Sequence, residues 1–282
     1  MKNNIMSVIR KGCIAVFVLT MMVIIGNVSV AQAKKTDAIT AQSFYRSGNI
    51  LYYTHPQSGF IYSYNIKTEK TKKIRENEGT IFGYTKLIVK GKYIYALLDK
   101  SLGSDGEVVD AEIDRISIDG KKRKTLADHT WNNLSIAGKK LIYNKLVGGK
   151  NYDAKMGAQM SMSLNGKNIK SAKNITVVSD KNSPNYGYNN DVENITFSTG
   201  KYNYSISDDS KELKRDGKTI YKCSGSDWIP YIQSAYVHGK SVVVIHSYEK
   251  KKGSEIEIRN KLVHMDINGK NRKTLSDYIP VG

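Results

Sequence analysis

The sequence predicts an all-β fold built from a four-stranded unit that is repeated about five times. Two patterns support this fold class. A turn-and-strand segment recurs about every 50 residues, and apolar residues alternate with polar ones beside it. The composition agrees, because the 282 residues include 4 prolines, 23 glycines and 19 tyrosines. No stretch with helical periodicity competes with these strands in residues 34–282.

The recurring segment consists of a turn followed by a strand rich in lysine or arginine. Asn-Gly or Asp-Gly stands at the turn in four copies, and Lys67-Thr68 replaces it in the first. These glycine dipeptides supply the positive φ angles of a two-residue hairpin turn. Alternating residues such as Ile116 and Ile118 precede the turn and predict a strand with one buried face. The five copies are Tyr62–Ile74, Ile116–Leu126, Met162–Ala172, Leu213–Lys222 and Met265–Leu275.

A second recurring element lies upstream of each turn. It consists of a glycine, a polar residue and a strand composed mostly of tyrosine, isoleucine or valine, and a short strand precedes it. Each unit therefore contains four strands joined in sequence. The glycines are Gly48, Gly91, Gly138, Gly200 and Gly239, and the short strands before them are expected at Ala41–Tyr45, Leu87–Val89, Asn133–Ile136, Asn194–Phe197 and Ile232–Val237.

Four antiparallel strands repeated at this spacing are typical of a β-propeller blade. We predict five blades, with a six-bladed ring as the alternative. The alternative arises because Ser276–Gly282 resembles Ser226–Tyr231, which opens the fifth unit. In the five-bladed arrangement the terminal segment closes the ring against the first blade, since an open ring would leave an exposed sheet edge. Long loops on one face are expected at Leu102–Ile113, Gly148–Gln159 and Lys250–Asn260.

The repeat also resembles a known family. Its pattern, G-K-x-I-Y-Y followed by I-Y-x-I-x-x-D-G-K-x-x-K-x-L, is similar to a bacterial domain of unknown function described as a low-density-lipoprotein-receptor-related, TolB-like β-propeller. The resemblance implies a propeller fold, an extracytoplasmic setting and a binding role, because its motifs are structural and not catalytic. The fourth unit departs most, since Tyr202–Asp216 is short and polar. The matching segments are Gly48–Tyr53 with Phe60–Ile74, Gly91–Tyr95 with Ile113–Leu126, and Gly239–Val244 with Leu262–Leu275.

The first 33 residues have the layout of a secretory signal. A basic start is followed by an apolar run over residues 14–25 and by Ala31-Gln32-Ala33, a small-x-small cleavage site. We predict cleavage there, which leaves residues 34–282 as a single propeller domain that is secreted or associated with the cell wall. The alternative is an uncleaved membrane anchor, which would be the protein's one contact with a membrane. After cleavage Cys223 is the sole cysteine, which excludes an internal disulfide and a multi-cysteine metal site.

The chain is strongly basic, with a formal net charge of +18 at pH 7. This charge would suit an anionic polymer of the cell envelope as a partner. The cationic residues, however, concentrate in the strand after each hairpin turn, which is the outermost strand of a propeller blade. Lysine on such an edge prevents edge-to-edge pairing, and we favour that role. Nucleic acid is not an expected partner, because no nucleic-acid motif is present. The edge residues are Lys70, Lys72, Lys73, Lys121, Lys122, Arg123, Lys124, Lys167, Lys170, Lys270, Arg272 and Lys273.

Motifs for catalysis or metal binding are not found. The histidines occur singly, and neither a His-Glu-x-x-His, a Gly-x-Ser-x-Gly nor a P-loop pattern appears. His238 and His246 flank a strand and are interpreted as packed or surface residues. The acidic stretch Asp105–Asp114 lacks the spacing of an EF-hand and equally fits a solvated loop. We therefore predict no metal and no cofactor.

Two tryptophans and several acids are the candidate binding residues. The tryptophans lie between one unit and the next, where the channel of a propeller opens, and would hold a sugar or peptide or else seal neighbouring blades. Asp99 is a further acid of interest. The other acids recur near unit boundaries, where they would also serve as turn residues. The candidate binding residues are Trp131, Trp228, Asp128, Asp227 and Asp277, and no catalytic residue is assigned.

These observations predict a secreted or cell-surface propeller that acts as a non-catalytic binding or interaction module. The alternative is an extracellular propeller enzyme that acts on a glycan as a hydrolase or lyase, which requires carboxylates, or a set of histidine and tyrosine side chains, converging at the channel mouth. A third possibility is a subunit that offers an unclosed sheet edge to another protein. Because propellers support many activities, the choice depends on the site.

Overall fold

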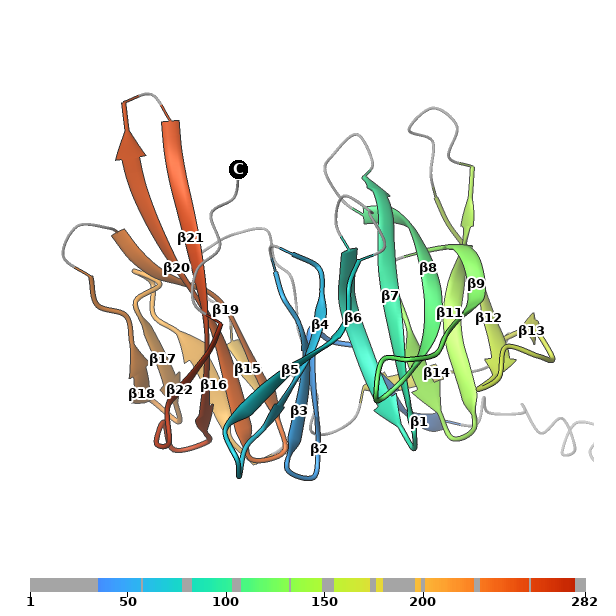
Figure 1. The fold of residues 1–282 in the computed structure, drawn as a ribbon, viewed down its shortest axis with the longest axis horizontal. Coiled ribbons are helices and arrows are strands. Elements are labelled where there is room, and N and C mark those ends of the chain that lie inside the picture. Colours follow the sequence, from blue (N-terminus) through green and yellow to red (C-terminus); the bar gives the residue numbers. More distant parts are fainter. Residues whose placement is uncertain are drawn as a thin grey trace, which may run out of the picture. The chain divides into compact units, whose positions relative to one another are not determined.

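Every regular element that the computed structural model describes is a β-strand (Figure 1). This confirms the predicted all-β class. No helix long and apolar enough to cross a membrane occurs in the described segments, and the expected signal, residues 1–33, lies outside them. The description covers residues 35–56, 58–77, 83–102, 108–131, 133–148, 155–172, 176–179, 196–198, 201–225, 229–253 and 255–276.

Most of the described strands follow one another with short connections, as the repeat predicts, while residues 180–195 between β14 and β15 lie outside the description. They are β1 (Lys35–Thr40), β2 (Phe44–Ser47), β3 (Ile50–Thr54), β4 (Ile61–Asn65), β5 (Lys70–Arg75), β6 (Gly83–Lys90), β7 (Tyr93–Leu102), β8 (Val108–Ser117), β9 (Arg123–Thr130), β10 (Ser135–Ala137), β11 (Lys140–Val147), β12 (Lys155–Ser163), β13 (Lys170–Ser171), β14 (Thr176–Ser179), β15 (Thr196–Ser198), β16 (Asn203–Ile206), β17 (Glu212–Arg215), β18 (Lys218–Lys222), β19 (Ile229–His238), β20 (Ser241–Lys252), β21 (Glu255–Asp266) and β22 (Lys273–Ser276).

Three of the predicted units form separate four-stranded antiparallel sheets, whose strand orders are β2-β3-β4-β5, β15-β16-β17-β18 and β19-β20-β21-β22. The second and third units belong to one ten-stranded sheet with the path β14-β1-β10-β11-β9-β8-β7-β6, in which β12 pairs with β11 and with β13. One residue pair, Lys145 with Thr130, joins β11 to β9. The strand order inside each unit is therefore as predicted, while the count of five separate blades stays a prediction.

The start of the described chain differs from the expectation. Residues 35–40 form a strand of their own, β1, which pairs with β10 so that Ala38 faces Ala137. The strand predicted at Ala41–Tyr45 is wrong in its first half, and β2 begins at Phe44. The reason is that the backbone of Ala41 and Gln42 bonds at the ten-stranded sheet: the Ala41 N–H donates to the Leu134 carbonyl, and Gln42 forms a bridge with Leu87. Only tertiary contacts specify this path.

The upstream turns at Gly48, Gly91, Gly138 and Gly239 are two-residue hairpin turns, as at Gly48, where Ser47 pairs with Ile50. Gly200 lies outside the described residues. The Asp-Gly and Asn-Gly turns were predicted to be equally short, and this is correct only at Asp216-Gly217, where both residues have positive φ and Arg215 pairs with Lys218. The other three turns are longer. In each of them, the glycine N–H donates to the carbonyl oxygen of the residue three positions earlier, as from Gly120 to Ser117 at 2.8 Å. This is the pattern of a type I turn that ends in glycine.

Two of these longer turns contact the preceding unit closely. A Cβ atom at Gly120 would overlap the carbonyl oxygen of Ile74, and one at Gly269 would overlap that of Ile220. Ile74 lies in β5 and Ile220 in β18, the last strands of the preceding units. Glycine is required there for its φ angle and also because the turn packs directly on the neighbouring backbone.

We expect Gly269→Ala to lower the free energy of unfolding by about 2 kcal/mol more than Gly239→Ala does. Both glycines have positive φ, 76° and 60°, so both variants share the backbone strain of about 1–2 kcal/mol. Only position 269 adds the overlap with Ile220, because nothing lies within 4 Å of a Cβ at Gly239. Urea unfolding of the two variants measures the difference. Equal decreases in the free energy of unfolding would show that the turn at Gly269 can move away from Ile220 without destabilising the protein.

The described parts of the three long insertions are mostly strands of extended hairpins, which corrects the prediction there, while residues 103–107, 149–154 and 254 lie outside the described residues. β20 and β21 pair continuously up to Lys252 opposite Glu255. β7 likewise reaches Leu102, and β11 reaches Val147. Continued pairing satisfies the backbone N–H and C=O groups, which explains why polar sequence in these segments still forms strands.

Among the described residues the core forms four clusters, each shared by two units. β2–β5 packs on β6–β9, which in turn packs on β10–β12. β19–β22 packs on β16–β18 and also on β2–β4. The first and last sheets are therefore in direct contact, through residues such as Tyr53 and Leu262. The terminal segment that was predicted to close this contact is Ser276–Gly282, of which residues 277–282 lie outside the described residues.

Contact on two sides buries both faces of the middle strands. In β8, Ala111 and Ile113 are buried on one face, and Glu112 and Asp114 are buried on the other. The alternating pattern predicted one buried face only. The polar face can be buried because ion pairs neutralise it, which no pattern within a single strand reveals.

Most of the lysine-rich strands lie at sheet edges, as predicted, but β9 does not, because it pairs with β8 and also with β11. β5, β18 and β22 each end the order of their sheets, and β13 pairs only with β12. In β5 the first four residues are exposed, and Ile74 is the buried position. Arg123 is the exception, because its guanidinium binds two carboxylates inside the second unit.

Candidate functional site

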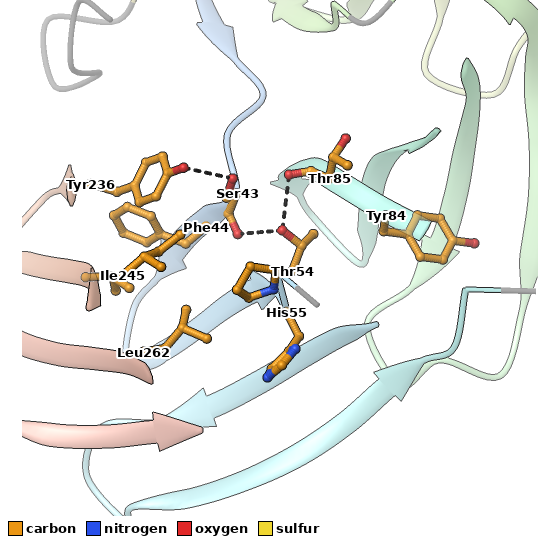
Figure 2. A pocket seen from close by; sticks show the side chains of 11 residues that line it. Ser43, Phe44, Thr54, His55, Tyr84, Thr85, Tyr236, Ile245 and Leu262 are labelled. Carbon is orange, nitrogen blue, oxygen red and sulfur yellow. Dashed lines mark hydrogen bonds between the residues drawn. The ribbon is translucent and has the colours of Figure 1, made fainter. Parts of the chain in front are cut away.

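A cavity of about 150 Å³ lies where the sheets β2–β5 and β19–β22 meet the start of β6 (Figure 2). One wall is apolar and belongs mainly to β20 and β21. The opposite wall carries hydroxyl groups and a histidine. The lining residues are Ser43, Phe44, Thr54, His55, Pro56, Tyr84, Thr85, Tyr236, Val243, Ile245 and Leu262.

Hydrogen bonds link the strands around the polar wall. The Ser43 hydroxyl donates to the Tyr236 hydroxyl at 3.3 Å, which joins the residue before β2 to β19. The Thr54 hydroxyl lies 3.2 Å from the Ser43 carbonyl oxygen and 3.1 Å from that of Thr85. Since a hydroxyl has one proton, Thr54 donates to one of these carbonyls at a time. Figure 2 shows these contacts as a chain from Tyr236 to Thr85.

His55 supplies a neutral ring to the same wall. It follows the last residue of β3 and is 2% exposed. Burial lowers the pKa of His55 below its ordinary value, so the imidazole is uncharged at neutral pH. The Ser58 N–H donates to His55 Nδ1 at 3.2 Å. In the neutral ring the proton is therefore carried by Nε2.

Thr85 reaches the cavity through a β-bulge. The pairing of β6 with β7 shifts between Tyr84 and Lys86, which makes Thr85 an extra residue in β6. A bulge of this kind re-aims a side chain that regular pairing would place elsewhere. The Thr85 hydroxyl is buried without a hydrogen bond of normal geometry, and so are both carboxylate oxygens of nearby Asp99.

Asp99 is a buried carboxyl close to the cavity but is not one of its lining residues. It is 0% exposed and pairs across the strands with Gly83. Burial raises the pKa of Asp99 to about 6, against the smaller opposing effects of the Thr85 hydroxyl and the Lys86 charge. Burial likewise lowers the pKa of Lys86. Burial therefore disfavours the charged form of both side chains.

A network of ion pairs lies behind Tyr84. The ring of Tyr84 lines the cavity, while its hydroxyl donates to Asp114 Oδ2 at 2.8 Å. Arg123 Nε binds the same carboxylate at 2.6 Å, and the guanidinium also binds Glu112. Lys100 Nζ lies 2.7 Å from Glu112. These acids are thus engaged by cations and not directed into the cavity.

The chain has distant structural neighbours. It is similar to a structure in a crystal of a nidogen/laminin complex, with 11% identity, coverage of 87% of this chain and 80% of that chain, and a TM-score of 0.30. It is also similar to a protein assigned as TolB from Agrobacterium tumefaciens, with 15% identity, coverage of 85% and 82%, and a TM-score of 0.30. No protein-family model matches the chain, and no curated protein matches it. Similarity at this level does not establish a shared fold, so the propeller stays a prediction.

The structure describes two of the five predicted binding residues. Trp131 is half-buried between β9 and β10, and its N–H donates to the Asn144 carbonyl at 2.9 Å. Asp128 is exposed in β9, where Lys100 Nζ lies 2.8 Å away and lowers its pKa. Neither residue lines the cavity. Asp227, Trp228 and Asp277 lie outside the described residues, so their predicted role stays a prediction.

The acidic stretch does not act as one group of ligands. Asp105 and Glu107 lie outside the described residues, and Glu112 and Asp114 bind Arg123. Asp110, Asp128 and His129 place possible ligand atoms within 4.8 Å of one another. The charge of Asp128 is already balanced by Lys100, and we assign no metal to this cluster.

Two further histidines are packed inside sheets. His246 Nδ1 lies 2.7 Å from the Tyr221 hydroxyl, and its ring stacks on Tyr248 at 4.1 Å. His264 Nε2 lies 2.9 Å from the Ser241 hydroxyl. Burial lowers the pKa of each histidine to about 4. His246 is therefore a packed residue, as the sequence indicated, while the side chain of His238 lies outside the described residues.

Sequence reasoning did not find the residues of the cavity. Thr54 lies 11 positions after Ser43 and 31 positions before Thr85, and no sequence motif links the three residues. His55 was noted only as one of the scattered histidines. The one signal in the sequence was its place directly after the predicted buried strand that begins at Gly48, where a side chain at a strand end can lie against a neighbouring sheet.

Proposed function

We propose that this chain is an extracytoplasmic β-propeller that acts as a non-catalytic binding module. Its cavity would hold a small uncharged group, a hydroxyl or an amide, that belongs to a glycan or protein partner. The propeller is supported by the repeated four-stranded order and by the packing of each unit on the next. The setting is supported by the signal-like first 33 residues.

The observation that carries this proposal is the chemistry of the cavity. Among the described residues that line it, none carries a carboxylate, whereas Phe44, Tyr84 and Tyr236 are aromatic. A glycoside hydrolase requires two carboxyl groups that flank the scissile bond, about 5–10 Å apart. An aromatic surface with hydroxyl donors and a neutral histidine instead suits hydrogen bonding to an uncharged ligand.

A cavity-filling variant tests the proposal. We expect Ser43→Leu to weaken binding of the partner by about tenfold or more, because the larger side chain occupies the cavity. Ser47→Leu is the matched control, since Ser47 is exposed at the other end of β2. Binding would be measured by calorimetry against a panel of uncharged oligosaccharides, uncharged peptides and a polyanion. Equal affinities for the two variants would exclude the cavity as the binding site.

The same panel addresses the two remaining alternatives. A glycan that gains one water per cleaved bond, or that yields an unsaturated sugar, would establish the hydrolase or the lyase and replace the binding proposal. Binding of the polyanion that weakens with rising salt would assign the partner to the basic edge strands. Binding to an uncharged probe that does not change with salt supports the cavity.

A further inference from the structure

The recurring turns of this chain gather positive charge at one end of its sheets. In a sheet of antiparallel strands joined in sequence, the first and third connections lie at the same end. These connections are the two recurring turns of each unit, and we call this end the turn end. Lysines predominate there, and the acid Glu69 is already paired with Lys273 at 2.7 Å. The described cations of these turns are Lys67, Lys92, Lys121, Lys122, Lys139, Lys167, Lys201, Lys240, Lys270 and Arg272, and the described acids are Glu69, Asp119 and Asp216.

The turn ends of neighbouring units are in contact with one another. Each contact is made by residues in a turn or close to one, and the series runs from the fourth unit through the fifth, first and second to the third. The lysines of all five units therefore belong to one basic surface. The contacts are Arg215 Nη1 with Asn268 Oδ1 at 2.8 Å, Arg46 Nη1 with the Ser241 hydroxyl at 2.8 Å, Ile50 with the apolar cluster that contains Ile94, and the Tyr95 hydroxyl with the Leu164 carbonyl at 3.1 Å.

The fold does not require lysine in three of these turns. Gly91, Gly138 and Gly239 have φ angles of 61°, 60° and 60°, whereas the lysine after each has no positive φ. This is the pattern of a type II′ turn, which requires glycine only at its first central position. Asn49 takes the second position in the first unit. Protection of open sheet edges does not explain these lysines either, because a turn has no open ladder of backbone groups.

The chemistry of this surface suits a chain of phosphate groups. A lysine ammonium binds phosphate as a point charge, whereas planar, two-point recognition of a carboxylate is typical of arginine. Cations spread over five units match a ligand that repeats its charge along its length. We propose that the turn end binds an extended anionic polymer that carries a phosphate in each repeat. This polymer is a second partner, in addition to the uncharged group that the cavity holds.

Two observations distinguish this surface from a membrane-binding face and from the cavity. A membrane-binding face buries a contiguous apolar area beside its lysines. The described large apolar side chains exposed at the turn end are only Tyr93, Ile118 and Ile169, and Arg115 covers the ring of Tyr93 at 4.7 Å. The cavity residue Thr85 lies near the first residue of β6, whereas the turn follows the last. The polymer and the cavity ligand can therefore be held at the same time.

Removal of turn lysines tests the proposal. The affinity of the full chain, in the form that its cell produces, is measured for inorganic polyphosphate by calorimetry at low and at physiological ionic strength. We expect binding that weakens with salt. Lys92→Gln, Lys139→Gln and Lys240→Gln together should weaken it by about tenfold or more. The three side chains are exposed, and none pairs with an acid in the described part of the chain, so the fold should be unaffected.

The matched control removes three exposed lysines that lie outside the turns. Lys72→Gln in the edge strand β5, combined with Lys145→Gln and Lys251→Gln, lowers the net charge by the same amount. This variant should keep an affinity near that of the wild type, because exposed charges distant from the ligand are screened. Ser43→Leu should also leave the affinity for polyphosphate unchanged, which separates this surface from the cavity.

Several outcomes would contradict the turn end as the binding surface. The proposal is overturned if polyphosphate does not bind, if salt does not weaken its binding, or if the two triple variants weaken it equally, since total charge would then determine the affinity. Loss of affinity in the control alone would assign the polymer to the edge strands, and loss in Ser43→Leu would assign it to the cavity. Equal or tighter binding of polyglutamate, or of vesicles of phosphatidylglycerol and phosphatidylcholine, would exclude a phosphate polymer as the preferred partner.

Discussion

Replacing Arg123 by methionine is expected to lower the free energy of unfolding at pH 7 by about 3 kcal/mol or more. Methionine retains much of the volume of the arginine side chain but cannot form the ion pairs with Asp114 and Glu112. Asp114 is 0% exposed, so the variant would leave a buried carboxylate without its cation. The hydrogen bonds from Tyr84 and Thr125 remain, but they do not neutralise the charge.

The pH dependence of this loss gives a second check. Burial, the largest influence, already raises the pKa of Asp114 above its ordinary value. A carboxyl with a raised folded-state pKa destabilises the fold increasingly as pH rises through that pKa, and the removal of Arg123 raises it further. The deficit should therefore shrink as pH falls from 7 toward 4. Urea unfolding of Arg123→Met and of Lys124→Met, whose side chain is exposed, measures it, and equal small losses would refute a structural ion network.

Asp99→Asn is expected to stabilise the protein at pH 7 by about 1–3 kcal/mol. The upper figure follows from a pKa raised from 3.8 to about 6, at about 1.4 kcal/mol for each pKa unit. The charged form is disfavoured in the folded state, so stability falls as pH rises from about 4 to 6, and the amide avoids this loss. The gain is reduced because Lys86 loses its nearby opposite charge.

The test is the difference between Asp99→Asn and the wild type across pH 4 to 7. The buried histidines act in the opposite direction, because a lowered folded-state pKa makes stability fall as pH decreases below 6.5. This contribution cancels in the difference. The gain should disappear near pH 4, while the exposed Asp208→Asn control stays near zero throughout. A loss of stability at pH 7 would mean that the Asp99 carboxylate accepts hydrogen bonds in its charged form.

The strand order of each unit could be predicted because its signals are local. Gly48 and Gly91 mark two-residue turns through their own φ angles, and the alternation beside them marks strands. The length of the later turns was misjudged for a tertiary reason. The turn at Gly120 packs against the backbone of Ile74 in the preceding unit. The Asp-Gly dipeptide carries no information about that contact, so the turn length could not be predicted from it.

The candidate cavity could not be predicted because its residues come together only through packing between sheets. Ser43, Thr54 and Tyr236 meet where the first and last sheets touch, and Thr85 joins them through a bulge. The burial of Asp99 and Asp114 also depends on neighbouring sheets. In a strand pattern both acids indicate a solvated face. Arg123 of the neighbouring strand β9 compensates the burial of Asp114 but does not contact Asp99.

The amino-acid sequence by itself determined the all-β class, the four-strand order of the repeat and the lysines at sheet edges. These depend on backbone φ preferences, on alternation and on side-chain polarity, which are properties of neighbouring residues. Tertiary structure alone decided which sheets touch, how far β20 and β21 extend, and which polar groups line the cavity. These depend on contacts between residues up to about 200 positions apart, such as Ser43 and Tyr236, whose free energy is gained only when the units pack together.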